Sequence, residues 1–186
     1  RIWQVPYSQG QGLLGVFNPA LPYSADDLRY AGLDFEEGRF CKSYITDHVL
    51  WEYFGDRAQA IKEEFLQHSP TRPGFYEFKE DFDSQRKIKK HVHGKAQYQE
   101  IASGLESLIG EILFHKEDNE HSHKYHPRIA VHFTKSYRDL DDRQKQSLNE
   151  IYNSYFYHRH DLFWKDQALV KLPAIVDATE MLVCGE

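Results

Sequence analysis

The sequence contains few of the residues that mark several common protein classes. Of its 186 residues only two are cysteines, Cys41 and Cys184, which is too few for a disulfide framework or a four-ligand zinc site. Mean hydropathy is −0.70, and no apolar run approaches the roughly 18 residues that a membrane helix needs. The N-terminus also lacks the layout of a signal peptide. These absences favour a cytoplasmic protein with reduced thiols, without a membrane partner.

Positive charge is in deficit as well. Lys and Arg together number 23 against 29 Asp and Glu, which gives a formal net charge of −6. A domain that neutralises phosphates normally carries the opposite sign, so nucleic acid is not an expected partner. The composition is 40% hydrophobic and 15% aromatic, which is typical of a folded domain with a real core.

Both ends of the sequence favour an internal segment of a longer protein. The chain begins at Arg1 without a methionine and continues directly into an apolar stretch. It finishes with an apolar run at residues 181–184, typical of a strand buried on both faces in a parallel sheet, followed by Gly185 and Glu186. A carboxylate at the end of such a strand is where barrel enzymes place catalytic groups, although any charged residue can end a strand.

Apolar residues at helical spacing dominate the middle of the chain. Ser24 followed by Asp27 resembles a capping box, and Gly32 is a plausible helix stop. The alternation of Ile129, Val131 and Phe133 predicts a short strand or an extended segment instead. Helices are predicted over residues 25–31, 44–54, 58–66, 101–113 and 141–173. The proline- and glycine-rich stretch 69–74 is the clearest break and predicts a boundary near residue 74.

Two motifs that invite a cofactor are better explained otherwise. Gly10, Gly12 and Gly15 match the dinucleotide-binding pattern, but Pro19 and Pro22 forbid the helix that must follow it, so no cofactor is expected. The 11 histidines form clusters without the spacing of a zinc site, so no metal is expected either. The clusters at 91–93 and 121–126 are interpreted as solvated surface. The third, at 157–161, is interpreted as a polar seam between helices, with a sugar-facing wall as the alternative.

Aromatic residues flank the glycine-rich loop near the start. Trp3 and Phe17 suit either a hydrophobic core or a sugar-binding cleft, where flat apolar faces stack on pyranose rings. The two interpretations are equally compatible with the sequence.

Distinctive strings spread along the whole chain carry a family resemblance. They are RIWQVP at 1–6, GLLG at 12–15, NPALP at 18–22, YHRH at 157–160, LPA at 172–174 and MLVCGE at 181–186. With these strings the chain resembles the 4-alpha-glucanotransferases, also called amylomaltase or disproportionating enzyme. The likeness is to the larger subtype of plant cytosol and Bacteroides-like bacteria.

The resemblance implies a retaining transferase that moves α-1,4-glucan or glucosyl units between chains on a (β/α)8 barrel. Glu186 matches the general acid/base of the family's Gly-Glu-Asp-Leu-Gly motif. The nucleophile is expected before Arg1 and a third carboxylate after residue 186. Trp3, Phe17 and Asn18 are expected to contact substrate, and Gln4 departs from the Glu that relatives often carry. The implied partners are maltose, malto-oligosaccharides and glycogen or starch-like glucan.

The resemblance also implies how the chain is organised. Residues 1–74 are expected to form a barrel strand-end loop and the helices that follow it. Residues 75–165 are expected to form a helical insertion between two catalytic barrel strands, and residues 166–186 the return helix and the strand that carries Glu186. The fold class is therefore mainly α, an α+β helical fragment excised from a barrel, and the isolated fragment is expected to be inactive.

Two other functions fit the same sequence. The helical region can be a module that binds branched polysaccharide or mediates self-association without catalysis. Alternatively, the chain is a stand-alone helical protein without any link to carbohydrate.

Overall fold

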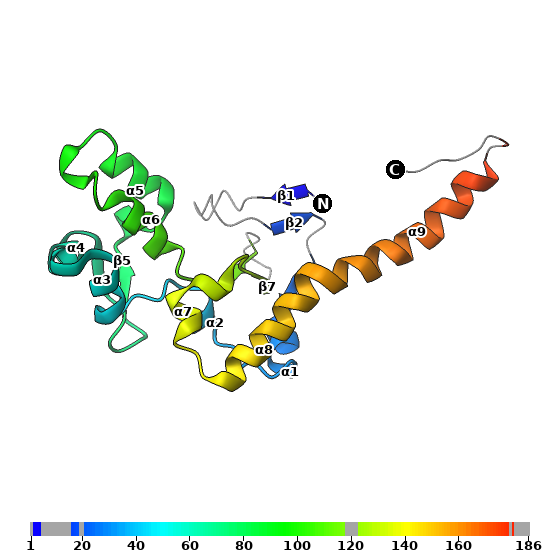
Figure 1. The fold of residues 1–186 in the computed structure, drawn as a ribbon, viewed down its shortest axis with the longest axis horizontal. Helices are drawn as coiled ribbons and strands as arrows, with labels where there is room; N and C mark the ends of the chain where they lie inside the picture. The colour runs from blue at the N-terminus through cyan, green and yellow to red at the C-terminus, as the bar shows by residue number, and fades with distance from the viewer. Residues whose placement is uncertain (1, 5–15, 19–20, 118–122, 179, 181–186) are drawn as a thin grey trace.

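The computed structural model describes residues 2–4, 16–18, 21–117, 123–178 and 180 (Figure 1). Over these residues the chain is mostly helical with three small antiparallel sheets, as the predicted mainly α class requires. The helices are α1 (Ala25–Tyr30), α2 (Glu37–Phe40), α3 (Asp47–Phe54), α4 (Ala58–Phe65), α5 (Gln85–Val92), α6 (Ala102–Ile109), α7 (Lys135–Arg138), α8 (Asp142–Asn153) and α9 (Arg159–Asp177). Shorter helical turns are η1 (Gly55–Arg57), η2 (Glu80–Phe82), η3 (Ala96–Tyr98), η4 (Val131–Phe133) and the π-helical η5 (Ser154–His158).

The strands pair in three separate groups. They are β1 (Ile2–Gln4), β2 (Val16–Asn18), β3 (Tyr23–Ser24), β4 (Leu66–His68), β5 (Tyr76–Phe78), β6 (Phe114–Lys116) and β7 (Lys124–Pro127). β1 pairs with β2, β4 pairs with β5, and β7 lies between β3 and β6. The pairing of β3 with β7 therefore brings together two segments that lie about a hundred residues apart in the chain.

Local chemistry explains where the helices begin and end. The Ser24 hydroxyl accepts from the Asp27 N–H at 3.1 Å, and the Asp27 carboxylate accepts from the Ser24 N–H at 2.8 Å, so the predicted capping box is confirmed. Gly32, at φ +88°, reverses the chain after α1 in a conformation that favours glycine. Thr46, Ser84, Thr134 and Asp141 cap α3, α5, α7 and α8 through their side chains.

In the part of the chain that the structure describes, buried side chains form two hydrophobic clusters. One comes from a single stretch between Ile45 and Ile109, and the other combines residues 23–40 with residues 113–156. We call residues 45–109 the inner lobe and residues 23–40 with 113–158 the outer lobe. In Figure 1 the inner lobe lies at the left, around α3 to α6, and the outer lobe lies beside it. The inner lobe is thus inserted into the outer one, through an outgoing connector at residues 41–44 and a return connector at 110–112.

The predicted break at residues 69–74 is the loop of a hairpin. Leu66 of β4 lies opposite Phe78 of β5, and both Leu66 and Tyr76 belong to the inner-lobe cluster. Gly74 adopts φ +80° in this loop. The hairpin therefore keeps the chain within one lobe on both sides of residue 74. The division into 1–74, 75–165 and 166–186, as barrel and insertion, stays a prediction.

The strand predicted around residues 129–133 is wrong. Ala130 adopts the left-handed conformation at φ 56°, and Val131–Phe133 form a 3-10 turn. Val131 is fully buried whereas Phe133 is 87% exposed, so the alternation reflects a turn with one side chain in the core. The strand of this region is β7, which includes His126 of the histidine cluster interpreted as solvated surface.

Two helix ends also differ from expectation. α6 stops at Ile109, where Gly110 follows, because the Leu113 N–H donates to the Phe40 carbonyl at 2.9 Å and draws the chain into the outer lobe. Conversely, Pro173 does not end the last helix, which continues to Asp177. The helical prediction from residue 141 is otherwise confirmed, and its apolar stripe, with Leu148, Ile151, Tyr155 and Phe156, is buried.

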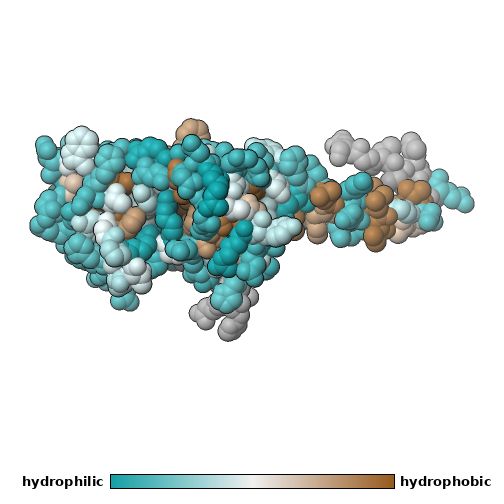
Figure 2. Space-filling model, turned by 90° about the horizontal axis from the view of Figure 1, so that it is seen from below, coloured by the Kyte–Doolittle hydropathy of each residue, from teal (hydrophilic) through white to brown (hydrophobic). Residues whose placement is uncertain are grey.

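The last helix projects away from the two lobes (Figure 1). Apolar side chains along it are exposed, as the brown patches on the projecting part of Figure 2 show. They are Leu162, Leu169, Val170, Leu172, Ile175 and Val176, each 49–73% exposed. Within the described ranges, no helix combines the length and the apolar content required to cross a membrane.

Candidate functional site

The site residues predicted from sequence lie at the margins of the structure. Glu186 is outside the described residues, so its role as acid/base stays a prediction. Trp3 lies on β1, and Phe17 and Asn18 lie on β2. The antiparallel register places the Cα atom of Trp3 opposite that of Phe17, and Ile2 opposite Asn18. The backbone of the three expected substrate-binding residues is therefore brought together, and their contact with a sugar stays a prediction.

The surface interpretation of the histidine clusters is correct only in part. His93 and His123 are exposed, and His121 lies outside the described residues. For His126 the interpretation is wrong, because it is only 4% exposed and its Nδ1 lies 2.8 Å from the Tyr155 hydroxyl. Tyr125, His126 and Pro127 are buried in β7, the central strand of its sheet, and His126 meets Tyr155 of η5, a contact that local polarity does not reveal.

The third histidine cluster supports the structural interpretation. His160 is 1% exposed, and its Nδ1 lies 3.0 Å from the Tyr155 carbonyl oxygen. The Arg159 guanidinium lies over the ring of Tyr23, 4.1 Å from its centroid. These residues tie α9 to the outer lobe. Among the described residues, no three His, Cys, Asp or Glu side chains come together to hold a metal ion.

Hydrogen bonds hold the two lobes together at their junction. The two connectors run side by side: the Leu113 N–H donates to the Phe40 carbonyl at 2.9 Å, and the Tyr44 N–H donates to the Glu111 carbonyl at 2.7 Å. The Ser43 hydroxyl adds a bond of 2.9 Å to the Ile109 carbonyl. Backbone bonds on both sides of Lys42 therefore fix the connectors to each other.

Glu111, in the return connector, joins the two lobes through its side chain. It is 3% exposed, and its carboxylate accepts from the Tyr53 hydroxyl of α3 at 2.7 Å. The other oxygen accepts from the backbone N–H groups of Lys135 and Ser136 at 2.7 and 3.2 Å. These two groups open α7, where the helix dipole favours an anion. A buried carboxylate with three donors is stable because each hydrogen bond replaces a contact with water.

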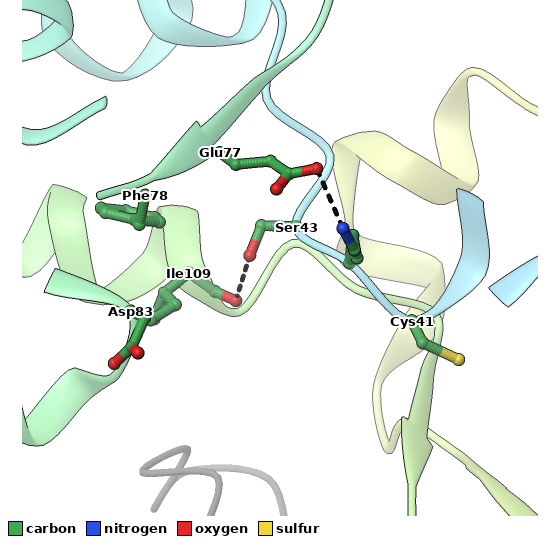
Figure 3. A pocket seen from close by; sticks show the side chains of 7 residues that line it. Cys41, Ser43, Glu77, Phe78, Asp83 and Ile109 are labelled. Atoms are coloured by element: carbon green, nitrogen blue, oxygen red, sulfur yellow. Dashed lines mark hydrogen bonds and ion pairs between the residues drawn. The ribbon is translucent and has the colours of Figure 1, made fainter. Parts of the chain in front are cut away.

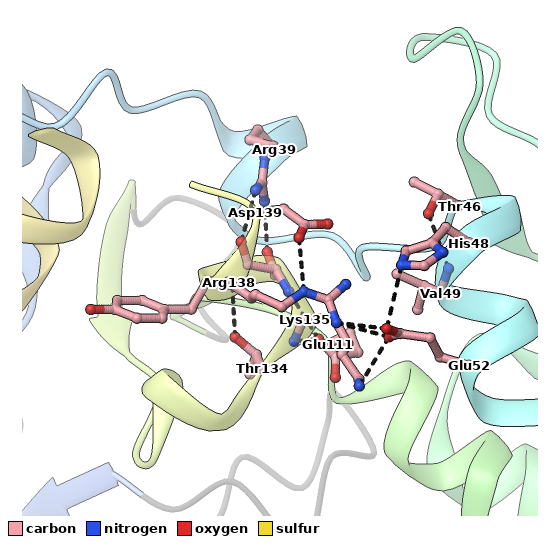
Figure 4. A network of polar contacts seen from close by, with 12 residues as sticks. Arg39, Thr46, His48, Val49, Glu52, Glu111, Thr134, Lys135, Arg138 and Asp139 are labelled. Atoms are coloured by element: carbon pink, nitrogen blue, oxygen red, sulfur yellow. Dashed lines mark hydrogen bonds and ion pairs between the residues drawn. The ribbon is translucent and has the colours of Figure 1, made fainter. Parts of the chain in front are cut away.

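A second carboxylate links the lobes at the surface (Figure 4). Glu52 of α3 accepts from Arg138 at 2.7 and 3.0 Å, and it lies 2.9 Å from Lys135 and 3.3 Å from His48. Hydrogen bonds from Lys135 and Arg138 lower the pKa of Glu52. Because these groups are partly solvated, the network sets the orientation of α3 against α7 more than it adds stability.

A cavity of about 220 Å³ opens at the same junction (Figure 3). Its walls come from the outgoing connector, from β5 with the turn after it, and from the end of α6. The lining residues are Cys41, Lys42, Ser43, Glu77, Phe78, Asp83 and Ile109. Residues separated by more than sixty positions in the sequence thus line one cavity. Helical periodicity in the sequence does not predict such a cavity.

The charges of this cavity compensate one another. Glu77 accepts from the Lys42 ammonium at 3.1 Å and from the Ser69 hydroxyl at 2.6 Å. Burial alone would raise the pKa of Glu77, but these two bonds outweigh it and lower the pKa. Asp83 pairs with Lys87 at 2.9 Å. Each carboxylate of the lining therefore has a cation beside it.

The arrangement is suited to binding more than to covalent chemistry. Burial, together with the nearby Glu37 carboxylate, raises the pKa of the Cys41 thiol, so the sulfur stays protonated and is a poor nucleophile. The Ser43 hydroxyl donates a hydrogen bond to the Ile109 carbonyl oxygen. The cavity offers fixed hydrogen-bonding groups beside an aromatic ring and an aliphatic side chain, which is the usual chemistry of a small-molecule pocket.

Comparisons with known proteins identify the family. No family profile matches the chain, and no solved structure matches it. Over 194 aligned positions the whole chain is 34% identical to 4-alpha-glucanotransferase DPE2 of Oryza sativa subsp. japonica, and it spans 20% of the length of that relative. The family resemblance drawn from the sequence is thereby confirmed, and the chain belongs to the 4-alpha-glucanotransferase family, where it corresponds to one segment of a longer relative.

Proposed function

We propose that the chain is part of a retaining 4-alpha-glucanotransferase that transfers α-1,4-glucan or glucosyl units between malto-oligosaccharides and glycogen or starch-like glucan. The observation that carries this proposal is the 34% identity along the entire chain to a 4-alpha-glucanotransferase. Residues 75–165 are proposed to form a helical insertion in a (β/α)8 barrel, and the enzyme is proposed to work in the cytoplasm.

In this proposal the chain supplies one of the two carboxyl groups that retention requires. The two groups of a retaining enzyme stand about 5 to 5.5 Å apart, one attacking the anomeric carbon and one protonating the departing oxygen. Glu186 is the proton donor, and after departure its carboxylate takes the proton from the 4-hydroxyl of the acceptor. The nucleophile and the stabilising carboxylate belong to segments that this chain does not include.

Trp3, Phe17 and Asn18 are proposed to favour transfer over hydrolysis. An acceptor sugar must be held better than water for a glycosyl intermediate to be passed to it. Aromatic faces stack on the apolar side of a pyranose, and an amide bonds its hydroxyls. The pairing of β1 with β2, which places Trp3 opposite Phe17, supports this role.

The experiment is disproportionation of maltotriose by the longer enzyme, native against Glu186→Gln. The amide keeps the shape but cannot act as acid, so turnover is expected to fall by about 10²- to 10⁴-fold. Glu180→Gln, six positions earlier and exposed, is the matched control and should retain native activity. Glucose release measures both. If the Glu186 variant keeps most of its activity, the assignment of the acid/base is wrong.

The 186-residue chain alone is expected to release no glucose from maltotriose, because it carries only one member of the catalytic pair. Glucose release that co-purified with the chain and was abolished by Glu186→Gln would contradict this expectation.

A further inference from the structure

The junction cavity has the size and the chemistry of a site for a small neutral polyol. Its volume of about 220 Å³ equals the space of about seven liquid water molecules, which is room for one pyranose ring. Drug-sized ligands require larger pockets, from about 300 Å³ upward. The cavity is therefore matched to one sugar ring with its hydroxyl groups.

The distribution of charge argues against an ionic ligand. Lys42 is paired with Glu77 at 3.1 Å, Arg72 lies 3.8 Å from the same carboxylate, and Asp83 is paired with Lys87 at 2.9 Å, so the charged groups of the lining already have partners. A phosphate or a metal ion would have to break one of these pairs. A hydroxyl group, in contrast, both donates to a carboxylate oxygen and accepts from an ammonium, so it adds to the pairs without breaking them.

The apolar part of the lining completes this pattern. Phe78 and Ile109 supply the apolar side chains of the lining, and Glu77 and Ser43 supply a carboxylate and a hydroxyl close to them, as Figure 3 shows. A pyranose has an apolar face of C–H groups and a rim of hydroxyls. An aromatic ring beside polar groups in fixed positions recognises both features at once.

The polar groups are held in place before any ligand arrives. Glu77 is fixed by Ser69 at 2.6 Å and by Lys42, and the Ser43 hydroxyl is fixed on the Ile109 carbonyl at 2.9 Å. Rigid groups lose little conformational entropy on binding. Lys42 and Ser43 belong to the outgoing connector, whereas Glu77 and Phe78 belong to the inner lobe. A bound sugar would therefore contact both the connector and the inner lobe.

We propose that the junction cavity is an accessory site for one glucosyl unit, separate from the residues assigned to catalysis. The choice of glucose among neutral polyols rests on the proposed function; the presence of a sugar-sized polyol site rests on the cavity alone. The site would hold the end of a glucan chain at the junction between the two lobes.

The test is titration of the 186-residue chain with maltose and with methyl α-D-glucopyranoside, followed by the amide NMR signals of Ser43, Glu77 and Ile109. We expect saturable shifts with millimolar affinity for both sugars. Phe78→Leu keeps an apolar side chain but removes the flat ring, and it should weaken binding by about threefold to tenfold. Asp83→Asn removes a charged acceptor and should weaken binding by about tenfold.

Asp81→Asn is the matched control, since Asp81 lies two positions earlier, is exposed and does not line the cavity. It should bind both sugars like the unmodified chain. The proposal is overturned if neither sugar shifts these signals, or if Phe78→Leu and Asp83→Asn, with native spectra elsewhere, bind as tightly as the control. Loss of maltotriose disproportionation on Glu186→Gln in the longer enzyme tests the proposed function separately. That result does not depend on the cavity, so either proposal can fail while the other stands.

Discussion

The pH dependence of stability should be dominated by one buried histidine. His115 on β6 is 1% exposed and lies opposite His126 of β7. Burial, aided by electrostatic interaction with His126 and Arg128, lowers the pKa of His115 from 6.5 to about 3. At pH 5 the folded protein therefore holds this imidazole neutral, while the unfolded chain protonates it. Between these two pKa values the unfolded state binds more protons, so stability falls as the pH falls.

The size of this effect follows from the two pKa values. Each unit of pH below the unfolded pKa removes about 1.4 kcal/mol, so lowering the pH from 7 to 5 should remove about 2 kcal/mol through His115. Urea unfolding followed by far-UV circular dichroism at both pH values measures this loss. His115→Gln should lack it, whatever its absolute stability at pH 7, and the exposed His93→Gln should lose as much as the native chain.

The reasoning is refuted if His115→Gln loses as much stability between pH 7 and pH 5 as the native chain does. An independent readout covers a variant that fails to fold. In the native chain the imidazole signals of His115 should show no titration between pH 7 and pH 5, and a midpoint near 6.5 would refute the same reasoning without any substitution.

Two further predictions concern the junction and the turns. Glu111→Ala leaves one hydroxyl and two backbone N–H groups without their acceptor and should lower the free energy of unfolding by about 3 kcal/mol. Glu100→Ala, which removes only an exposed ion pair, should change it by about 0.5 kcal/mol, and equal effects in urea unfolding would contradict the role of Glu111. Gly32→Ala should destabilise by about 1 to 2 kcal/mol, because at φ +88° the new Cβ would lie 2.9 Å from the Ser147 hydroxyl. Gly38→Ala, inside α2 with no atom within 4 Å of its new Cβ, should stabilise by about 0.5 to 1 kcal/mol, and a reversed order in thermal unfolding would refute this account.

Helices with a strong local signal were predictable from the sequence. The capping box at Ser24 fixes the start of α1, and the apolar stripe ending at Phe156 matches the buried face of α8 and η5. In both cases the deciding contacts are three or four residues apart. Where a distant partner decides, as at Leu113, the helix ends earlier than the stripe suggests.

The candidate cavity could not be predicted in the same way. Its acidic residues Glu77 and Asp83 lie in a stretch of mixed charge, which is typical of a solvated surface. Ser43 lies in a short loop. None of them belongs to a motif with a fixed spacing. They meet because the inner lobe leaves the outer lobe and returns at adjacent points, which brings residues 41–43 against the end of α6.

Sequence alone was enough for the family and for the helices whose caps and stripes are local, because each of these depends on residues that are neighbours in the chain. The three-dimensional fold alone decided that one lobe is inserted into the other, that His126 is buried, and that a charge-compensated cavity opens between the connectors. These features depend on contacts between residues 30 to 110 positions apart, such as those of Glu111 with Tyr53 and of Asp34 with Gln144. Such contacts form only when both hydrophobic clusters are buried together, and no local pattern encodes them.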